Sequence, residues 1–281
     1  MFDTRLPQPS DSFRWVQAGS QTALACRVLE PLVPHFFTTR DWALGSSSGG
    51  DKQPGWAEVA GAMAVGVDDL LRVHQVHGAA VVVRRAGARP ALYQPADIII
   101  TDDPTAAVAV QAADCVPLLL ADRRTGVVAA AHAGWRGLAL GVPRATVDAL
   151  AKEFGSRAAD LVAAVGPSVG ACCYEVGPDV RQRFDVAGVP PAVVASWFRA
   201  HPQPTLGNPS MAGLPPTRRE GHWFFDSGSA ASDALVLAGV PAEQIFVAGL
   251  CTASHPETLC SYRRDGAGAG RLAAVIRPRG V

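Results

Sequence analysis

Directly after the apolar run 126–130, the chain reads Ala131-His132-Ala133-Gly134-Trp135-Arg136-Gly137. The apolar run predicts a buried strand, and residues 138–143 lead into an expected helix. His132 therefore falls where a strand leaves the sheet, and Arg136 falls in the following turn. Because the residues that flank His132 are small, backbone or a ligand can approach it closely. The stretch predicts the polar floor of a pocket, and a capped strand with a histidine in the core is the alternative.

Short apolar runs of strand length follow one another through the middle of the chain. Polar turns separate three of these runs, 96–101, 107–111 and 116–121, which favours antiparallel pairing. No internal repeat is visible, and no linker divides the chain. The sequence therefore predicts an α+β fold, with a flexible N-terminal segment over 1–21 and a single catalytic domain over 22–281. We expect that domain to contain a large mixed β-sheet core covered by helices.

The composition is that of a globular protein. Of the 281 residues, 48% are hydrophobic and 18% are charged, and the formal net charge is zero. Without a basic stripe, a nucleic-acid partner is not expected, and without an apolar run of about 18 residues a membrane partner is not expected either. The first residues lack the apolar stretch of a signal peptide, which predicts a cytoplasmic protein. A monomer is the favoured oligomeric state.

The cysteines are expected to be mostly buried thiols that pack as small hydrophobic side chains. No two of them form a Cys-x-x-Cys motif, which excludes a zinc ribbon and a thioredoxin motif. Cys172 and Cys173 are adjacent, and neighbouring residues rarely form a disulfide without strain. The six cysteines are Cys26, Cys115, Cys172, Cys173, Cys251 and Cys260.

Three residues that can bind metals lie at expected strand ends beside small neighbours: His77, Cys115 and His132. Two imidazoles and one thiolate suit zinc or copper, and three protein ligands leave one position for water or substrate. Alternatively, Cys115 is a nucleophile and His132 is its base. His74 competes with His77, because residues three apart in a strand face opposite sides. Gly78 favours a turn at this point, so we choose His77.

Several motifs over about residues 35–277 resemble those of one bacterial family. They are the run 96–102, Ala113-Asp114-Cys115-Val116-Pro117-Leu118, His132-Ala133-Gly134-Trp135-Arg136-Gly137, Gly166-Pro167, Cys172-Cys173-Tyr174-Glu175-Val176-Gly177, Cys251-Thr252 and Ser261-Tyr262-Arg263-Arg264-Asp265. The sequence resembles the laccase-domain family, which is also called multicopper polyphenol oxidase, purine nucleoside phosphorylase or peptidoglycan editing factor. It departs from the family's pattern at 46–50 and at Asp226-Ser227-Gly228, which bears on the shape of the substrate pocket.

The resemblance implies a shared site at His77, Cys115 and His132 that binds zinc, with copper in some members. It also implies phosphorolysis of adenosine, inosine and methylthioadenosine, so that a purine nucleoside and phosphate are the expected partners. Adenosine deamination is implied as a side activity. The family's fold resembles that of a toxin deamidase with a Cys-His pair, which leaves an amidohydrolase acting on cell-wall precursors as one alternative. A copper-dependent polyphenol oxidase is another, although a multicopper centre needs more histidines than this one site offers.

Phosphorolysis requires an anion cradle and a slot for the purine. A guanidinium offers a planar fork to oxyanions, so the candidates for phosphate are Arg136 and Arg40, with Arg263 or Arg264 as further candidates. The candidates for stacking on the purine are Phe37, Trp135 and Tyr174. The alternative for Arg40 is a solvated surface arginine, and the alternative for each aromatic residue is a position in the core. Cys115, His132 and Arg136 are the expected catalytic residues.

Overall fold

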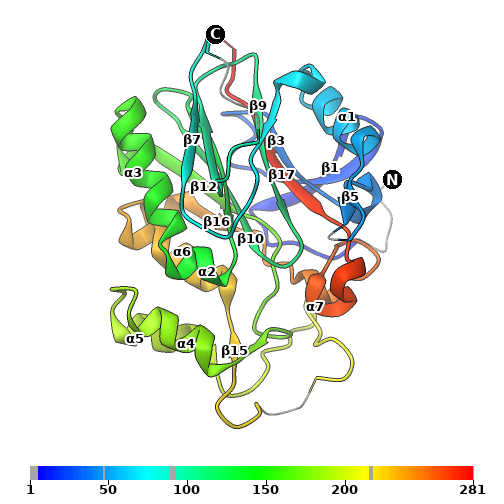
Figure 1. Cartoon of the computed structure of the whole chain (residues 1–281), viewed down its shortest axis with the longest axis vertical. Coiled ribbons are helices and arrows are strands. Elements are labelled where there is room, and N and C mark those ends of the chain that lie inside the picture. Colours follow the sequence, from blue (N-terminus) through cyan, green and yellow to red (C-terminus); the bar gives the residue numbers. More distant parts are fainter. Residues whose placement is uncertain (1–5, 47, 89–92, 215–217, 281) are drawn as a thin grey trace.

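Two six-stranded sheets form the centre of the molecule (Figure 1). The computed structural model describes residues 6–46, 48–88, 93–214 and 218–280. The first sheet has the order β1 (Phe13–Ala18), β2 (Gln21–Cys26), β3 (His35–Thr38), β17 (Leu272–Ile276), β9 (Ala107–Ala112) and β6 (Leu70–Arg72). The second sheet has the order β16 (Ile245–Val247), β12 (Leu161–Val165), β10 (Val116–Asp122), β11 (Val128–Ala133), β8 (Ile98–Thr101) and β7 (Val81–Arg84).

Both sheets are mixed. Strand β6 runs parallel to β9 in the first sheet, β7 runs parallel to β8 and β12 to β16 in the second, and the other neighbours are antiparallel. The α+β class is therefore confirmed, but two sheets replace the single large sheet that the sequence predicted. The chain passes from the first sheet to the second between β6 and β7 and between β9 and β10, and it returns between β8 and β9 and between β16 and β17. Runs of apolar residues do not reveal such a change of sheet.

The main core lies between the two sheets, and its pattern follows from the two-residue period of a strand. Along β10, Leu119 and Ala121 pack into a cluster that also contains Phe37 and Val108 of the first sheet. Their neighbour Leu120 packs on the opposite face, in a cluster with residues of the covering helices. Strand β10 is buried along its whole length, which explains why it reads as an almost continuous apolar run.

Helices cover the outer face of each sheet. In Figure 1, α3 (Val142–Phe154), α6 (Ser227–Leu237) and α2 (Trp135–Ala139) lie on one side of the pair of sheets, and α1 (Gln53–Ala62) lies on the other. Helix α3 has Pro143 in its first turn and ends before Gly155, whose φ of 65° is the left-handed conformation that terminates many helices.

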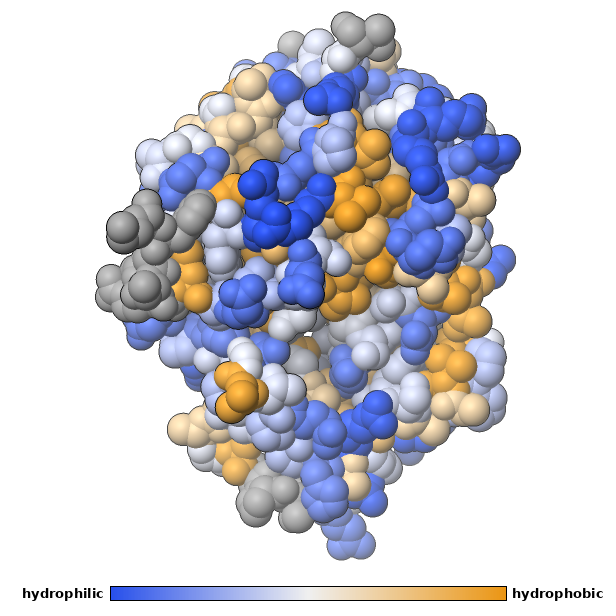
Figure 2. All heavy atoms as spheres, turned by 180° about the vertical axis from the view of Figure 1, so that it is seen from behind, coloured by the Kyte–Doolittle hydropathy of each residue, from blue (hydrophilic) through white to orange (hydrophobic). Residues whose placement is uncertain are grey.

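Smaller elements complete the fold. The helices are α4 (Pro178–Asp185), α5 (Pro191–Trp197) and α7 (Tyr262–Asp265). The strands are β4 (Gly45–Ser46), β5 (Gly50–Asp51), β13 (Glu175–Val176), β14 (Phe198–Arg199) and β15 (Trp223–Phe225). The short 3₁₀ helices are η1 (Arg40–Trp42), η2 (Val67–Asp69), η3 (Ala158–Asp160), η4 (Ala242–Gln244), η5 (Thr252–Ser254) and η6 (Gly266–Gly268). On the face shown in Figure 2, hydrophilic side chains interrupt the apolar ones. Within the described ranges, no helix combines the length and apolar character needed to cross a membrane.

The N-terminal segment differs from the prediction. Residues 1–21 were expected to be flexible, but β1 pairs with β2 along its whole length and Phe13 is 2% exposed. Side chains fasten this segment further, since the Trp15 indole donates a hydrogen bond to the Pro7 carbonyl and the Ser10 hydroxyl donates to the Val247 carbonyl. The proline and serine residues of this segment are typical of a flexible chain end, so its composition did not indicate these contacts. Residues 1–5 lie outside the described residues.

Candidate metal centre and substrate cleft

The structure brings the three predicted ligand residues together. His77 lies in the connection between β6 and β7, Cys115 lies between β9 and β10, and His132 lies near the end of β11. Their donor atoms all lie within 4.8 Å of one another, and Cys115 Sγ is 3.9 Å from His77 Nε2. The two imidazole rings meet edge to face, with their centroids 4.9 Å apart. Their role as metal ligands stays a prediction.

A buried carboxylate holds His77 in place. Asp97, which is 0% exposed, precedes β8 and accepts hydrogen bonds from three successive backbone N–H groups, those of Val76 at 3.2 Å, His77 at 3.1 Å and Gly78 at 2.6 Å. His77 has a φ of 59°, a left-handed conformation that is uncommon outside glycine. The three hydrogen bonds stabilise this turn, which turns the His77 ring toward Cys115.

The same carboxylate orients His132. Asp97 Oδ1 lies 2.8 Å from His132 Nδ1, and the His132 backbone N–H donates to the Asp97 carbonyl at 2.8 Å. With the proton on Nδ1, the Nε2 atom of His132 is left free for Cys115 or a metal. A carboxylate behind a ligating histidine is the usual way in which proteins fix the tautomer and the ring orientation. Although burial raises the pKa of Asp97, the hydrogen bonds from His132 and Gly78 outweigh that effect and lower it.

Replacing Asp97 with asparagine is expected to weaken metal binding by about 10–100-fold, because an amide cannot accept all of these hydrogen bonds or stabilise the His132 proton equally well. Competition with a chelator measures the affinity. Asp68→Asn, at an exposed aspartate outside the cleft, is the matched control and should leave it unchanged. A folded Asp97→Asn protein with the unchanged affinity would contradict the role given to Asp97.

The charges of Cys115 and His132 depend on each other. Burial raises the pKa of the Cys115 thiol, but the two neighbouring imidazoles outweigh this and lower it to about 6. Burial lowers the pKa of His132, but Cys115 and Asp97 outweigh this and raise it to about 9. In the metal-free protein at neutral pH the pair is therefore a thiolate beside an imidazolium. The thiolate is the form of cysteine that binds metals and attacks electrophiles.

Glycine at position 134 leaves space for this cluster. A Cβ atom there would lie 2.8 Å from Cys115 Sγ and 3.1 Å from His77 Cδ2. The backbone of Gly134 is extended, with φ −67° and ψ 173°, so any residue could adopt its conformation. The requirement is therefore steric, and it explains the small residue that the sequence places between His132 and Trp135.

The donor set fits a zinc ion. Two donors on one tetrahedral zinc lie about 3.3–3.8 Å apart, given bond lengths of about 2.0–2.3 Å. The 3.9 Å between His77 Nε2 and Cys115 Sγ is close to this range. Two imidazoles and a thiolate also suit copper. Of the clusters of possible ligands among the described residues, this is the one that contains histidine.

A cleft of about 1000 Å³ opens over the three residues. The lining includes Trp135, Arg136 and Tyr174, whose roles toward a substrate stay predictions, together with Arg263 and Arg271. The volume and the mixture of aromatic rings with cationic groups suit a small polar ligand that carries a flat ring.

Comparison with known proteins identifies the family. The sequence profile described as "Multi-copper polyphenol oxidoreductase laccase" matches residues 53–279. The chain belongs to this laccase family. The resemblance seen in the sequence motifs is thereby confirmed.

Relatives in the laccase family carry two kinds of name. A protein of Deinococcus radiodurans named purine nucleoside phosphorylase is 34% identical over 258 residues, which cover 87% of this chain and 88% of that protein. Adenosine deaminase RL5, from an unknown prokaryotic organism, is 32% identical over 74% of this chain and 75% of its own length. The crystal structure of the Bacillus licheniformis hypothetical protein YfiH superposes with a TM-score of 0.80 at 26% identity, covering 96% of this chain and all of that one.

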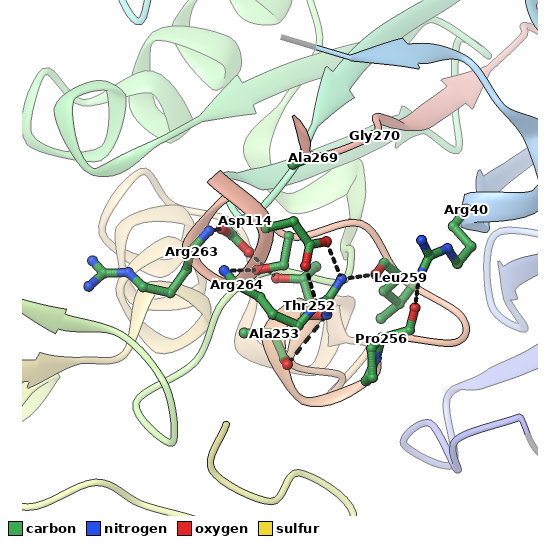
Figure 3. A network of polar contacts seen from close by, with 12 residues as sticks. Arg40, Asp114, Thr252, Ala253, Pro256, Leu259, Arg263, Arg264, Ala269 and Gly270 are labelled. Carbon is green, nitrogen blue, oxygen red and sulfur yellow. Dashed lines mark hydrogen bonds and ion pairs between the residues drawn. The ribbon is translucent and has the colours of Figure 1, made fainter. Parts of the chain in front are cut away.

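In this laccase-family chain, the arginines that are candidates for phosphate binding differ in their positions relative to the cleft. Arg136 lies over the Trp135 ring, 4.3 Å from its centroid, and Arg263 lies over the Tyr174 ring at 4.9 Å. Arg264 does not line the cleft. Its guanidinium donates to the carbonyl oxygens of Thr252 and Leu259, as Figure 3 shows.

Arg40, another candidate for phosphate, lies away from the cleft. Its exposed side chain donates to the Pro256 carbonyl, on the other side of the Arg264 network from Arg263 (Figure 3), and it does not line the cleft. Strand β3 ends just before Arg40 and directs it toward the 252–259 loop. Phe37, the third aromatic candidate, is buried in the core between the sheets.

Sequence reasoning missed three contributors to the site. Asp97 gave one signal, an acidic residue directly before three isoleucines, where a buried carboxylate needs several hydrogen-bond partners. Gln75 gave no signal, yet its side chain donates to the Gln111 carbonyl at 2.7 Å and accepts from the Gln111 N–H at 2.6 Å. Arg271 also lines the cleft, from a position just beyond the last of the motifs.

Proposed function

We propose that the protein cleaves purine nucleosides with phosphate, releasing the base and forming ribose 1-phosphate. The observation that supports this best is the composition of the cleft, which holds the His77, Cys115 and His132 group beside arginine and aromatic side chains. The Deinococcus radiodurans relative named purine nucleoside phosphorylase, which is 34% identical over 258 residues, gives further support.

The arginines and aromatic residues account for the two halves of the substrates. Arg136 and Arg263 present guanidinium groups to the cleft, which suit phosphate oxygens and the charge that develops during transfer. Trp135 and Tyr174 offer ring surfaces for the purine. In this proposal Arg136 holds phosphate near the anomeric carbon, because phosphate must attack that carbon as the base departs.

The His77, Cys115 and His132 group completes the proposal as a zinc site, with copper as the other candidate metal. A bound zinc would supply a Lewis acid that polarises the substrate or a water molecule. Asp97 keeps the proton of His132 on Nδ1 and holds the turn at His77, so both rings keep their positions through the reaction. The relative named adenosine deaminase supports a secondary deamination of adenosine at the same cleft.

Phosphate dependence tests the proposal directly. With adenosine or inosine as substrate, base release should require inorganic phosphate and yield ribose 1-phosphate in equal amount, because phosphate is the nucleophile. Chromatography of the products with and without phosphate measures both. Base release at the same rate without phosphate, with free ribose as product, would show the assignment to be wrong.

A Cys-His amidohydrolase is the second candidate, and the charge state of Cys115 favours it. The thiolate beside the protonated His132 is the arrangement of a cysteine nucleophile with its general acid. Such an enzyme retains its activity after a chelator removes the metal. The proposed phosphorylase loses its activity under the same treatment.

A further inference from the structure

A second group of sulfur atoms lies outside the cleft. Cys172 and Cys173 lie in the turn between β12 and β13, and Cys251 follows β16. Their three Sγ atoms all lie within 4.8 Å of one another. Each of these side chains is buried, and the residues that line the main cleft do not include any of them.

Backbone donors point at two of these sulfur atoms. The Gly170 N–H donates to Cys251 Sγ at 3.4 Å, and the Met211 N–H donates to Cys173 Sγ at 3.3 Å. Such a contact stabilises negative charge on the Cys251 sulfur, whereas the Cys173 thiol also donates to the Pro209 carbonyl at 3.8 Å. Ser254 Oγ lies 3.5 Å from Cys172 Sγ and 3.6 Å from Cys173 Sγ. Its own proton is donated to the Pro209 carbonyl at 2.7 Å.

The group has a route to solvent. Cys172 and Cys251 line a second cleft of about 490 Å³, which shares no lining residue with the first. A site of sulfur ligands that is supported by surrounding hydrogen bonds and can be reached from a cleft meets the requirements for metal binding.

We propose that Cys172, Cys173 and Cys251 bind one Cu(I) ion. Three sulfur atoms without a carboxylate or imidazole in the group select soft cations over hard ones. Zinc prefers four ligands in structural sites, whereas Cu(I) accepts two or three sulfur ligands. A disulfide would leave one thiol over, and one between the adjacent Cys172 and Cys173 would be strained.

A copper titration tests this site separately from the first one. The Cys115→Ser variant removes the thiolate of the His77, Cys115 and His132 group, so any remaining high-affinity sulfur site lies elsewhere. Reduced, metal-free Cys115→Ser protein is titrated without oxygen against the Cu(I) chelator bicinchoninate. We expect one Cu(I) ion per chain with a copper absorption edge and scattering typical of a sulfur-only shell.

Two further variants locate that ion. Adding Cys251→Ala should abolish the binding, whereas adding Cys26→Ala, at a buried cysteine in β2, should leave it unchanged. Circular dichroism confirms that both variants fold. The proposal is overturned if the Cys115→Ser protein binds no Cu(I), if the Cys251→Ala change leaves one ion bound, if zinc displaces the Cu(I), or if thiol counting shows a disulfide within the group.

Discussion

Replacing Cys115 with serine is expected to remove the bound metal and the purine-releasing activity together. A neutral hydroxyl is a far poorer zinc ligand than a thiolate, and the two remaining imidazoles, His77 and His132, cannot hold the ion alone. The loss of affinity should exceed the about 10–100-fold that is expected for a residue behind the ligands. Metal analysis of the purified variant and an assay of base release measure the two effects side by side.

The control for this variant is Cys26→Ser, another cysteine-to-serine change at a buried position outside the cleft. Provided that the Cys26→Ser protein folds, it should retain both the metal and the activity. If the Cys115→Ser protein keeps its full metal content but loses all activity, then Cys115 acts as a nucleophile, and the amidohydrolase gains support over the phosphorylase.

Replacing Arg136 with alanine is expected to reduce the use of phosphate strongly. The change removes a charge-assisted donor from the proposed anion cradle, which is worth about 2–4 kcal/mol of transition-state stabilisation when the contact is direct. This corresponds to about a 30- to 900-fold loss in kcat/KM for phosphate. Metal content should stay unchanged, because Arg136 does not belong to the His77, Cys115 and His132 group.

Arg40→Ala provides the matched control. Both arginines have exposed side chains, but Arg40 contacts Pro256 and lies outside the cleft. Its replacement should leave the kinetics with phosphate unchanged. If both replacements lowered kcat/KM for phosphate equally, a position in the cleft would not explain the effect, and the role of Arg136 in holding phosphate would be contradicted.

The sequence revealed those site residues whose local context is distinctive. His77, Cys115 and His132 were expected at the ends of apolar runs, with Gly78 beside His77 and Ala133 beside His132, and the structure brings all three together. Asp97 was missed because its partners are backbone groups 19 to 21 positions earlier and the His132 ring 35 positions later. Neither separation follows from a local pattern.

The fold shows the same limit. Strand β10 and helix α3 were predicted from apolar runs, helical spacing and the early proline, which are all local features. The division into two sheets depends on which strands pair. The position of the Arg40 side chain depends on its contact with Pro256, in a loop more than 200 residues later. Such contacts between distant segments require the tertiary structure.

The passages of the chain between the two sheets have a consequence for stability. His77 lies on the crossing from β6 to β7 and Cys115 on the crossing from β9 to β10, and the Gln75 side chain joins the first crossing to Gln111 near the end of β9. An ion shared by His77 and Cys115 would therefore act as a cross-link between two halves of a sandwich. Because ligands that bind only the folded state stabilise it, the metal would resist the sliding of one sheet over the other. Conversely, a core substitution that shifts the sheets relative to each other would change the distances between the ligand atoms.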